Sequence, residues 1–221
     1  MKQLAILALV AGTCMISTSA KAVELVLNGS FENPAPGSSW NYSNPDGPYL
    51  TGSFTNWVSS GPSGVWQPNA SMFTSIPDGR QVGWTGNVLA AGSLTQTFSH
   101  TISVGETLTM SGESGDRSNL LSGYGGVTSG TVTLFTSSNV LLLQANVTGS
   151  GSTGLWNNFS LNMAPGSLDA YAGQSMYLVL ASPIGKQANF DKISVQVVPE
   201  PSTLTALGMF GLALLRKRKA K

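Results

Sequence analysis

Residues 131–135 read Thr-Val-Thr-Leu-Phe, with polar and apolar side chains in strict alternation. This period of two places Val132 and Leu134 on one face and is typical of a half-buried β-strand. Residues 140–143 form a continuous apolar run, which favours a central strand. Similar short runs recur along the chain, at 23–27, 54–58, 81–85, 94–104, 106–111, 155–161, 175–181 and 189–197.

Segments rich in Gly, Pro, Asn and Ser separate these runs, and long helical periodicity is missing. The sequence therefore predicts an all-β chain that folds as one antiparallel β-sandwich domain, residues 23–197. The expected loops are 33–48, 59–70, 111–126 and 149–154. Loops on a rigid sandwich are common places for binding sites.

Both ends of the chain have the pattern of removable segments. Residues 1–22 combine Lys2, an apolar stretch over 4–16 and the small-x-small triplet Ala20-Lys21-Ala22, which predicts a secretory signal peptide that uses the Sec translocon. Cys14, the only cysteine, lies inside this segment, so the mature body is expected to have no disulfide.

The C-terminal segment 198–221 has three parts. Val198-Pro199-Glu200-Pro201 is expected to be stiff and extended, because proline fixes φ and restricts the residue before it. An apolar run over 203–215 predicts a short membrane helix, and basic side chains that hold its end on the cytoplasmic side follow it: Arg216, Lys217, Arg218 and Lys219. The alternative is a buried C-terminal helix with a basic, solvated end.

This order of parts resembles the PEP-CTERM sorting signal. The resemblance implies recognition and cleavage by an exosortase, transient anchoring in the inner membrane, and delivery of the body to the cell surface or extracellular matrix. It also implies a Gram-negative bacterium that makes exopolysaccharide.

The body carries little charge. The whole chain has a net charge of +1, but residues 23–198 hold only four basic side chains against nine acidic ones, which gives −5. Because a basic surface is missing, binding to nucleic acid is not expected.

A second resemblance covers most of the body. Residues 27–33 (Leu-Asn-Gly-Ser-Phe-Glu-Asn) and 189–195 (Asn-Phe-Asp-Lys-Ile-Ser-Val) are similar to the paired end strands of galactose-binding-like, carbohydrate-binding jelly rolls. Residues 79–84 and 92–98 are similar to internal strands of that group, and Lys192 departs from its pattern. The resemblance implies a jelly-roll body and a structural Ca²⁺ held by Glu32 and Asp191.

Two interpretations of Asp191 stay open at this point. Two residues ahead of Ile193, it is expected to share the apolar face of its strand, where a carboxylate needs a partner. That partner is either Ca²⁺, which prefers six to eight oxygen ligands, or a set of backbone donors that cap the carboxylate, or a basic side chain such as Lys192 or Arg80.

Aromatic residues in the expected loops suggest contacts to sugar rings. The proposed carbohydrate-contacting residues are Trp57, Trp66, Arg117 and Tyr124. Trp66, between Gly64 and Pro68, is expected to be exposed, whereas Trp84 and Trp156 are expected to be core residues.

Catalytic chemistry is not expected from the sequence. His100 is the only histidine and lies in a strand-like run, and no Gly-x-Ser-x-Gly motif occurs. Glu113 and Asp116 are the nearest pair of carboxylates for glycoside hydrolysis, but they lie in a soft Gly/Ser-rich segment. We therefore expect a non-enzymatic, secreted protein that binds or is embedded in extracellular polysaccharide. The alternatives are a purely structural matrix protein and, less favoured, a weak glycoside hydrolase.

Overall fold

The computed structural model describes residues 21–118, 128–149 and 154–199. Predictions that fall on 1–20 and 200–221, namely most of the signal peptide, the apolar run and the basic tail, lie outside this range. Within the described residues, no helix is long and apolar enough to cross a membrane.

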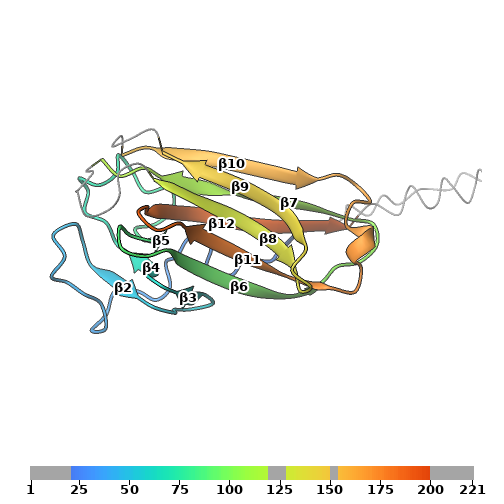
Figure 1. Ribbon diagram of the computed structural model, residues 1–221, viewed down its shortest axis with the longest axis horizontal. Helices are drawn as coiled ribbons and strands as arrows, with labels where there is room; N and C mark the ends of the chain where they lie inside the picture. The colour runs from blue at the N-terminus through green and yellow to red at the C-terminus, as the bar shows by residue number, and fades with distance from the viewer. Residues whose placement is uncertain (1–20, 119–127, 150–153, 200–221) are drawn as a thin grey trace, which may run out of the picture. The chain divides into compact units, whose positions relative to one another are not determined.

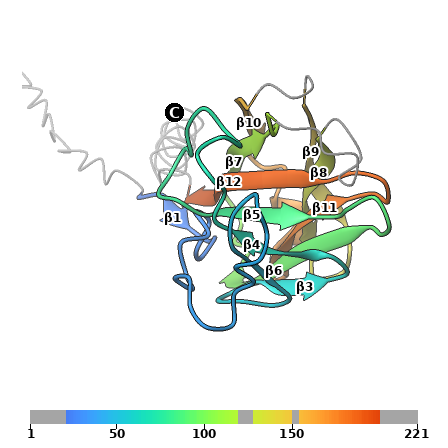
Figure 2. The same cartoon turned by 90° about the vertical axis from the view of Figure 1, so that its left-hand side faces the viewer.

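The described chain is an antiparallel β-sandwich (Figures 1 and 2), as the strand patterns predict. Its seven-stranded sheet has the order β10-β7-β12-β5-β4-β2, and β1 also pairs with β12. These strands are β1 (Val23–Glu24), β2 (Tyr49–Thr51), β4 (Ser63–Trp66), β5 (Val82–Thr85), β7 (Glu106–Gly115), β10 (Trp156–Met163) and β12 (Ala188–Pro199).

The second sheet has five strands in the order β3-β6-β11-β8-β9. They are β3 (Val58–Ser60), β6 (Gly92–Thr101), β8 (Ser129–Thr136), β9 (Leu141–Thr148) and β11 (Ser175–Ser182). A single turn of 3-10 helix, η1 (Asp169–Tyr171), precedes β11.

The main core lies between the two sheets. Val132 and Leu134 of β8 are fully buried in it, as their alternation predicts. On the opposite face of β8, Phe135 stacks on Tyr177 with ring centres 5.2 Å apart. One face of the strand thus packs in the core and the other does not, the arrangement that a period of two produces.

Three strand predictions need correction. The apolar run 140–143 begins β9, which is an edge strand and not a central one, and Leu141 at its start is exposed. The segment expected to be a loop at 59–70 contains β4, and the short strand β2, which follows the expected loop at 33–48, was not predicted. In addition, β7 continues to Gly115, beyond the predicted end at 111.

A β-bulge in β12 changes which face Asp191 occupies. The pairing of β12 with β7 shifts by one residue between Asp191 and Ser194, and Lys192 has a φ of 50°. Phe190 and Ile193 both lie in the main core, so Asp191 points to the other face of the sheet. The expectation that Asp191 shares a face with Ile193 is therefore wrong.

The start of the predicted tail is also part of the sandwich. Val198 and Pro199 are the last residues of β12, where they pair with Thr107 and Glu106 of β7. The ladder of β12 with β7 therefore continues two residues past position 197.

A second apolar cluster covers the outer face of the seven-stranded sheet. Its buried members are Trp66, Met72, Phe73, Val82 and Trp84, with Tyr49, Ile76 and Trp156 packed against them. Strands β2, β4 and β5 contribute Tyr49, Trp66, Val82 and Trp84, while Met72, Phe73 and Ile76 come from the segment between β4 and β5. The sheet therefore supports apolar side chains on both of its faces.

Candidate functional site

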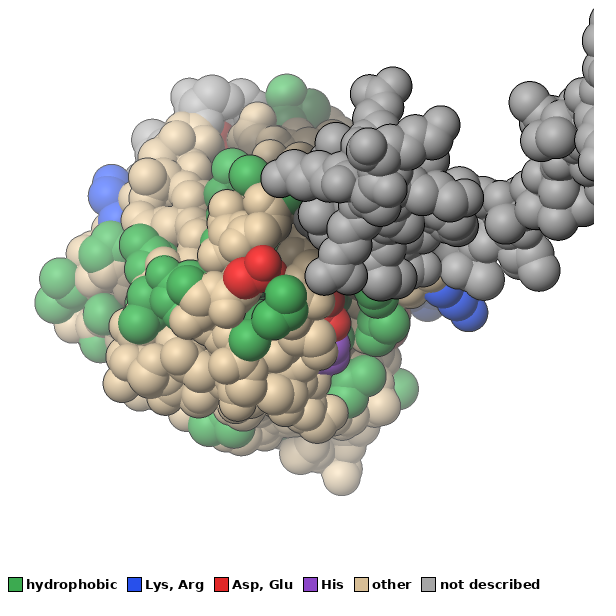
Figure 3. All heavy atoms as spheres, turned by 90° about the vertical axis from the view of Figure 1, so that its right-hand side faces the viewer, with side chains coloured by type: hydrophobic (Ala, Val, Ile, Leu, Met, Phe, Trp, Pro, Cys, Tyr) green, Lys and Arg blue, Asp and Glu red, His purple; other side chains and the backbone are tan. Residues whose placement is uncertain are grey.

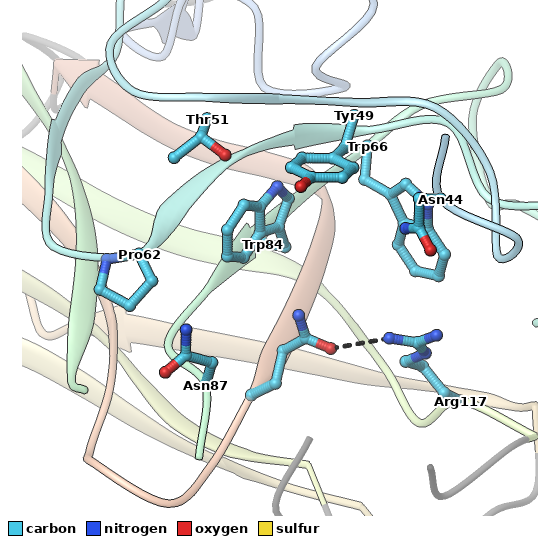
Figure 4. A pocket seen from close by; sticks show the side chains of 9 residues that line it. Asn44, Tyr49, Thr51, Pro62, Trp66, Trp84, Asn87 and Arg117 are labelled. Carbon is cyan, nitrogen blue, oxygen red and sulfur yellow. Dashed lines mark hydrogen bonds between the residues drawn. The ribbon is translucent and has the colours of Figure 1, made fainter. Parts of the chain in front are cut away.

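A pocket of about 310 Å³ opens on this outer face (Figure 4). It is lined by Asn44, Tyr49, Thr51, Pro62, Trp66, Trp84, Asn87, Arg117 and Gln187. Its walls come from β2, β4 and β5, the turn after β5, the residues that follow β7, and the residue before β12. Segments more than 100 residues apart in the sequence thus meet at one place.

Strand register sets the order of side chains across the pocket floor. Thr51 pairs with Gly64, Gly64 with Trp84, and Trp84 with Asn189. Because Gly64 has no side chain, the space between Thr51 and Trp84 stays open. A Cβ at Gly64 would lie 1.9 Å from the backbone oxygen of Leu50, so the glycine also allows β2 to approach β4.

Aromatic contacts hold the pocket wall in place. Tyr49 meets Trp84 edge to face, with ring centres 6.1 Å apart. Trp66 packs against Phe73 at 5.9 Å, and Phe73 packs against Trp156 at 4.8 Å. Such pairs favour fixed orientations, so the wall is rigid before any ligand binds.

Arg117 forms the side of the pocket next to Trp66, with its guanidinium carbon 4.6 Å from the centre of the ring. Its Nη2 donates to Oδ2 of Asp46 at 2.6 Å, and its Nη1 donates to Oε1 of Gln187 at 3.1 Å. Arg117 and Asp46 are both buried, so the positive charge at the pocket is balanced by a buried negative one.

The same ion pair anchors the loop that carries Asn44. The backbone nitrogen of Asn69 donates to the oxygen of Asp46 at 2.8 Å, and its side chain donates to the oxygen of Pro45. The backbone nitrogen of Asp46 donates to Oδ1 of Asn44 at 3.2 Å. Asp46 therefore links this loop to both Arg117 and the segment after β4.

The four residues predicted to contact carbohydrate have separate places in the structure. Trp66 and Arg117 line the pocket together, although Trp66 is only 4% exposed and not the exposed residue that was expected. Trp57 lies in the main core, stacks on Phe31 and donates to the backbone oxygen of Asn28, so it presents no face to a ligand. Tyr124 lies outside the described residues.

Trp84 was expected to be an ordinary core residue, and its place in the pocket was missed. Tyr49, Asn44, Asn87 and Gln187 were likewise not predicted as site residues. The sequence signal for these residues was weak. Gly64-Val65-Trp66 belongs to the buried strand β4, but the segment is short and lies between two prolines, a pattern that predicts a loop. Trp156, the other expected core residue, is half-buried and donates to the backbone oxygen of Ser75.

Glu32 and Asp191, the predicted calcium ligands, both bond to the segment 78–81. Oε1 of Glu32 accepts from the backbone nitrogens of Arg80 and Gln81. Oδ2 of Asp191 accepts from the backbone nitrogen of Asp78 at 2.9 Å, and its Oδ1 accepts from that of Lys192. Among the described residues, no group of three or more His, Cys, Asp or Glu side chains is placed to hold a metal.

Burial raises the pKa of Asp191 to about 7, well above the ordinary value of 3.8. The hydrogen bonds from Asp78 and Lys192 act in the opposite direction, and the negative charges of Asp78 and Glu113 add to the rise. Arg80 donates a hydrogen bond from its backbone nitrogen to Glu32, and the ammonium of Lys192 lies 3.4 Å from the carboxylate of Glu113. Among the described residues, backbone donors thus cap Asp191, as one of the alternatives predicted, and no ion pair with Lys192 or Arg80 is seen.

The other titratable side chains considered from the sequence contribute to the structure of the sandwich and do not line the pocket. His100 pairs with the buried Glu106 at 3.0 Å, and Glu106 also accepts from the backbone nitrogen of Ser103. Figure 3 shows the end of the molecule that carries this pair, with histidine in purple. Glu113 pairs with Lys192, Asp116 is buried directly after the end of β7, and neither carboxylate lines the pocket.

Comparison with solved structures relates the fold to cyclases from Fischerella. The Stig cyclase Fisc from Fischerella sp. TAU, in complex with (3Z)-3-(1-methyl-2-pyrrolidinylidene)-3H-indole, matches with a TM-score of 0.63 and 15% identity, over 81% of this chain and 100% of that one. An apo cyclase from Fischerella sp. matches with a TM-score of 0.62 and 15% identity, over 81% and 98%.

A third cyclase, from Fischerella sp. TAU in complex with 4-(1H-indol-3-yl)butan-2-one, matches with a TM-score of 0.62 and 16% identity, over 80% and 98%. At these identities the likeness establishes the shared sandwich fold. Comparison with curated protein sequences gives no match.

The model of one protein family matches nearly the whole sandwich. The family described as HpiC1-like, HpiC1 cyclase, matches residues 22–196. This match overturns the expectation of a non-enzymatic protein that binds or is embedded in polysaccharide, because the sequence argument considered only nucleophiles, metal clusters and paired carboxylates. On this evidence the chain belongs to the HpiC1-like cyclase family.

Proposed function

We propose that the chain is a cyclase that closes a ring within a small aromatic substrate bound in the pocket of Tyr49, Trp66 and Trp84. The observation that carries the proposal is the coincidence of the family match over 22–196 with a rigid pocket walled by aromatic residues. A volume of about 310 Å³ is at the lower end of the usual range for small-molecule sites, so the substrate is compact.

The pocket supplies two effects that a ring closure needs. Fixed aromatic walls hold a flexible substrate in a folded conformation, which brings its reacting atoms together and removes much of the entropic cost. The faces of Trp and Tyr rings attract positive charge, so they stabilise a cation that develops during ring closure. Ring closure within one molecule is an isomerisation and needs no redox partner.

The bound molecules in the related cyclases suggest the substrate class. Those proteins hold a 3H-indole derivative and 4-(1H-indol-3-yl)butan-2-one, and both of these molecules contain an indole ring system. We therefore propose a substrate with an indole ring, which stacks against the walls formed by Trp66 and Trp84.

Calorimetric titration of 4-(1H-indol-3-yl)butan-2-one into the folded body tests this assignment. We expect saturable binding that falls about tenfold or more in Trp84→Ala, since this change removes a whole aromatic wall. Leu141→Ala, on exposed β9, is the control and should bind like the parent. Absence of binding, or equal binding by Trp84→Ala, would count against the proposal. Incubation with indole-bearing compounds, followed by a search for products of unchanged mass and altered retention, then identifies the substrate.

We also propose that the sandwich is a jelly roll that binds a structural Ca²⁺ beside β12. The residues present fit this ion, because the carboxylates of Glu32 and Asp191 both bond to backbone nitrogens of the segment 78–81, which also carries the side-chain amide of Gln81. Oε1 of Gln81 is buried and has no hydrogen-bond partner among the described residues, which is the state expected of an oxygen that a cation would bind. A bound Ca²⁺ would offset the buried charge of Asp191 and tie 78–81 to β12.

Export is a further proposal, which rests on the two ends of the sequence. We propose that residues 1–22 direct the chain to the Sec translocon and that an exosortase removes the segment after β12. The Pro-Glu-Pro motif, the apolar run and the basic residues 216–219 support this.

A further inference from the structure

A second pocket of about 320 Å³ lies in the connection between β4 and β5. All of its lining residues belong to the segment 67–80, and it shares none of them with the first pocket. Pro68, Phe73 and Ile76 provide apolar walls, and Arg80 is the only charged side chain among the described residues that line it. The proposed cyclase activity assigns no role to this space.

Hydrogen bonds hold the walls of the second pocket in place. Thr74 donates to the backbone oxygen of Gly154 from its backbone nitrogen at 2.8 Å and from its hydroxyl at 3.0 Å. Nε1 of Trp156 donates to the backbone oxygen of Ser75 at 2.7 Å, and the ring of Trp156 packs on Phe73. The pocket is therefore formed before a ligand arrives, so binding requires little further ordering of the chain.

The guanidinium of Arg80 is not engaged by the protein. Among the described residues, only the backbone nitrogen of Arg80 is bonded, to Oε1 of Glu32 at 2.7 Å. The neighbouring carboxylates of Glu32 and Asp78 form no ion pair with the Arg80 side chain, which is exposed. A guanidinium presents two parallel N–H donors that match the two oxygens of a carboxylate. The charge beside these apolar walls is thus complementary to an organic anion.

We propose that the second pocket binds a small organic carboxylate, with the carboxylate on Arg80 and the apolar body against Pro68 and Ile76. A single cation matches the single charge of such a ligand. Phe73, which also lines this pocket, packs on Trp66 of the first pocket with ring centres 5.9 Å apart. A ligand bound here therefore supports the aromatic wall of the first pocket, although its binding does not depend on the proposed cyclase activity.

Two probes of nearly the same size separate the charge from the apolar body. Calorimetry compares phenylacetate with phenylacetamide, which has the same ring but no charge. We expect phenylacetate to bind saturably and about tenfold or more tightly than phenylacetamide, because hydrogen bonds to a charged group are the stronger ones. Inorganic phosphate measures the contribution of charge alone and should bind more weakly than phenylacetate, since it has no apolar body.

Variants assign the preference to Arg80. Arg80→Gln removes the cation but keeps the backbone nitrogen that bonds to Glu32. It should bind phenylacetate about tenfold more weakly and lose the preference over phenylacetamide, and Arg80→Lys should recover part of both. Ile76→Ala should weaken both probes by a similar factor, because it removes apolar contact area only. Lys192→Gln is the matched control, since it removes one 48% exposed cation outside the pocket, and it should bind both probes like the parent.

Three results would overturn this inference. The first is an absence of saturable phenylacetate binding, and the second is binding that Arg80→Gln leaves unchanged or that Lys192→Gln weakens equally. The third is inorganic phosphate that binds as tightly as phenylacetate, which would indicate a site for bare anions. None of these results bears on the cyclase assignment, which is tested separately with 4-(1H-indol-3-yl)butan-2-one.

Discussion

The guanidinium of Arg117 lies 4.6 Å from the centre of the Trp66 ring. The same group is bonded to Asp46 at 2.6 Å, and both charged side chains are buried. This arrangement makes one wall of the pocket depend on an ion pair, so the pair is a sensitive point for both stability and binding.

Removal of Asp46 should therefore destabilise the protein strongly. Asp46→Ala leaves the Arg117 cation buried without that carboxylate, and we expect the free energy of unfolding to fall by about 3–5 kcal/mol in urea denaturation. Lys192→Met is the control, because it breaks an ion pair with Glu113 whose lysine is 48% exposed, and it should cost less than about 1 kcal/mol. Similar losses in the two variants would contradict this account of the pair.

Gly64→Ala should disturb the pocket by displacing β2, the strand that carries Tyr49. The new Cβ would lie 1.9 Å from the oxygen of Leu50, so β2 must move away from β4 and carry Tyr49 with it. We expect a loss of about 1–3 kcal/mol in thermal or urea unfolding and weaker binding of the indole ketone. Gly37→Ala is the matched control, since its nearest atom is 3.9 Å away. A Gly64→Ala protein that matches Gly37→Ala in both measurements would refute the close approach.

Asp191 should make the calcium-free protein less stable as the pH rises toward neutrality. Its pKa is raised to about 7 in the folded state, so the folded protein binds a proton that the unfolded chain has lost above about pH 4. This contribution is fully present below the ordinary carboxyl pKa and is lost as the pH rises through 7. In EDTA, the unfolding free energy of the wild type relative to Asp191→Asn should fall by a few kcal/mol, on the order of magnitude expected for such a shift, between pH 4 and 8.

Calcium should reverse that loss. At pH 8 we expect added Ca²⁺ to raise the unfolding temperature of the wild type, because the ion binds the folded state only. The variants Glu32→Gln and Asp191→Asn should lose this response. An unfolding temperature that calcium leaves unchanged in the wild type would rule out the metal site, although the pH dependence in EDTA would still be expected.

The sandwich itself was largely predictable, because its longer strands carry strong local signals. Strand β8 alternates over five residues, and Val132 and Leu134 are buried as that pattern requires. The two strands that were missed, β2 and β4, have only three and four residues and lie among Gly, Pro and Ser. Such short segments become strands only by pairing with neighbouring strands. A local sequence pattern does not show which strands these neighbours will be.

The pocket was less predictable for the same reason. Trp66 and Arg117 were predicted to contact sugar, and the structure places both in the lining of one pocket. Trp84 has the local pattern of a core residue, and only the register of β4 against β5 places it beside the pocket. The extra residue of the bulge at Lys192 likewise turns Asp191 to the opposite face, against the strand parity predicted from sequence.

The two ends of the chain give a separate prediction. Mass spectrometry of the protein isolated from its native host should find Val23 as the first residue and a C-terminus close to Pro199. Because β12 ends at Pro199, cleavage after this residue leaves the ladder with β7 intact. A mature protein that retains residues 216–221 would contradict exosortase processing.

A crystal structure of the body with 4-(1H-indol-3-yl)butan-2-one tests the central claim most directly. We expect the indole ring against Trp66 and Trp84, in the pocket that these residues line with Tyr49. Ligand bound elsewhere on the sandwich, with this pocket holding only water at saturating ligand, would contradict the assignment of the pocket as the active site of a cyclase.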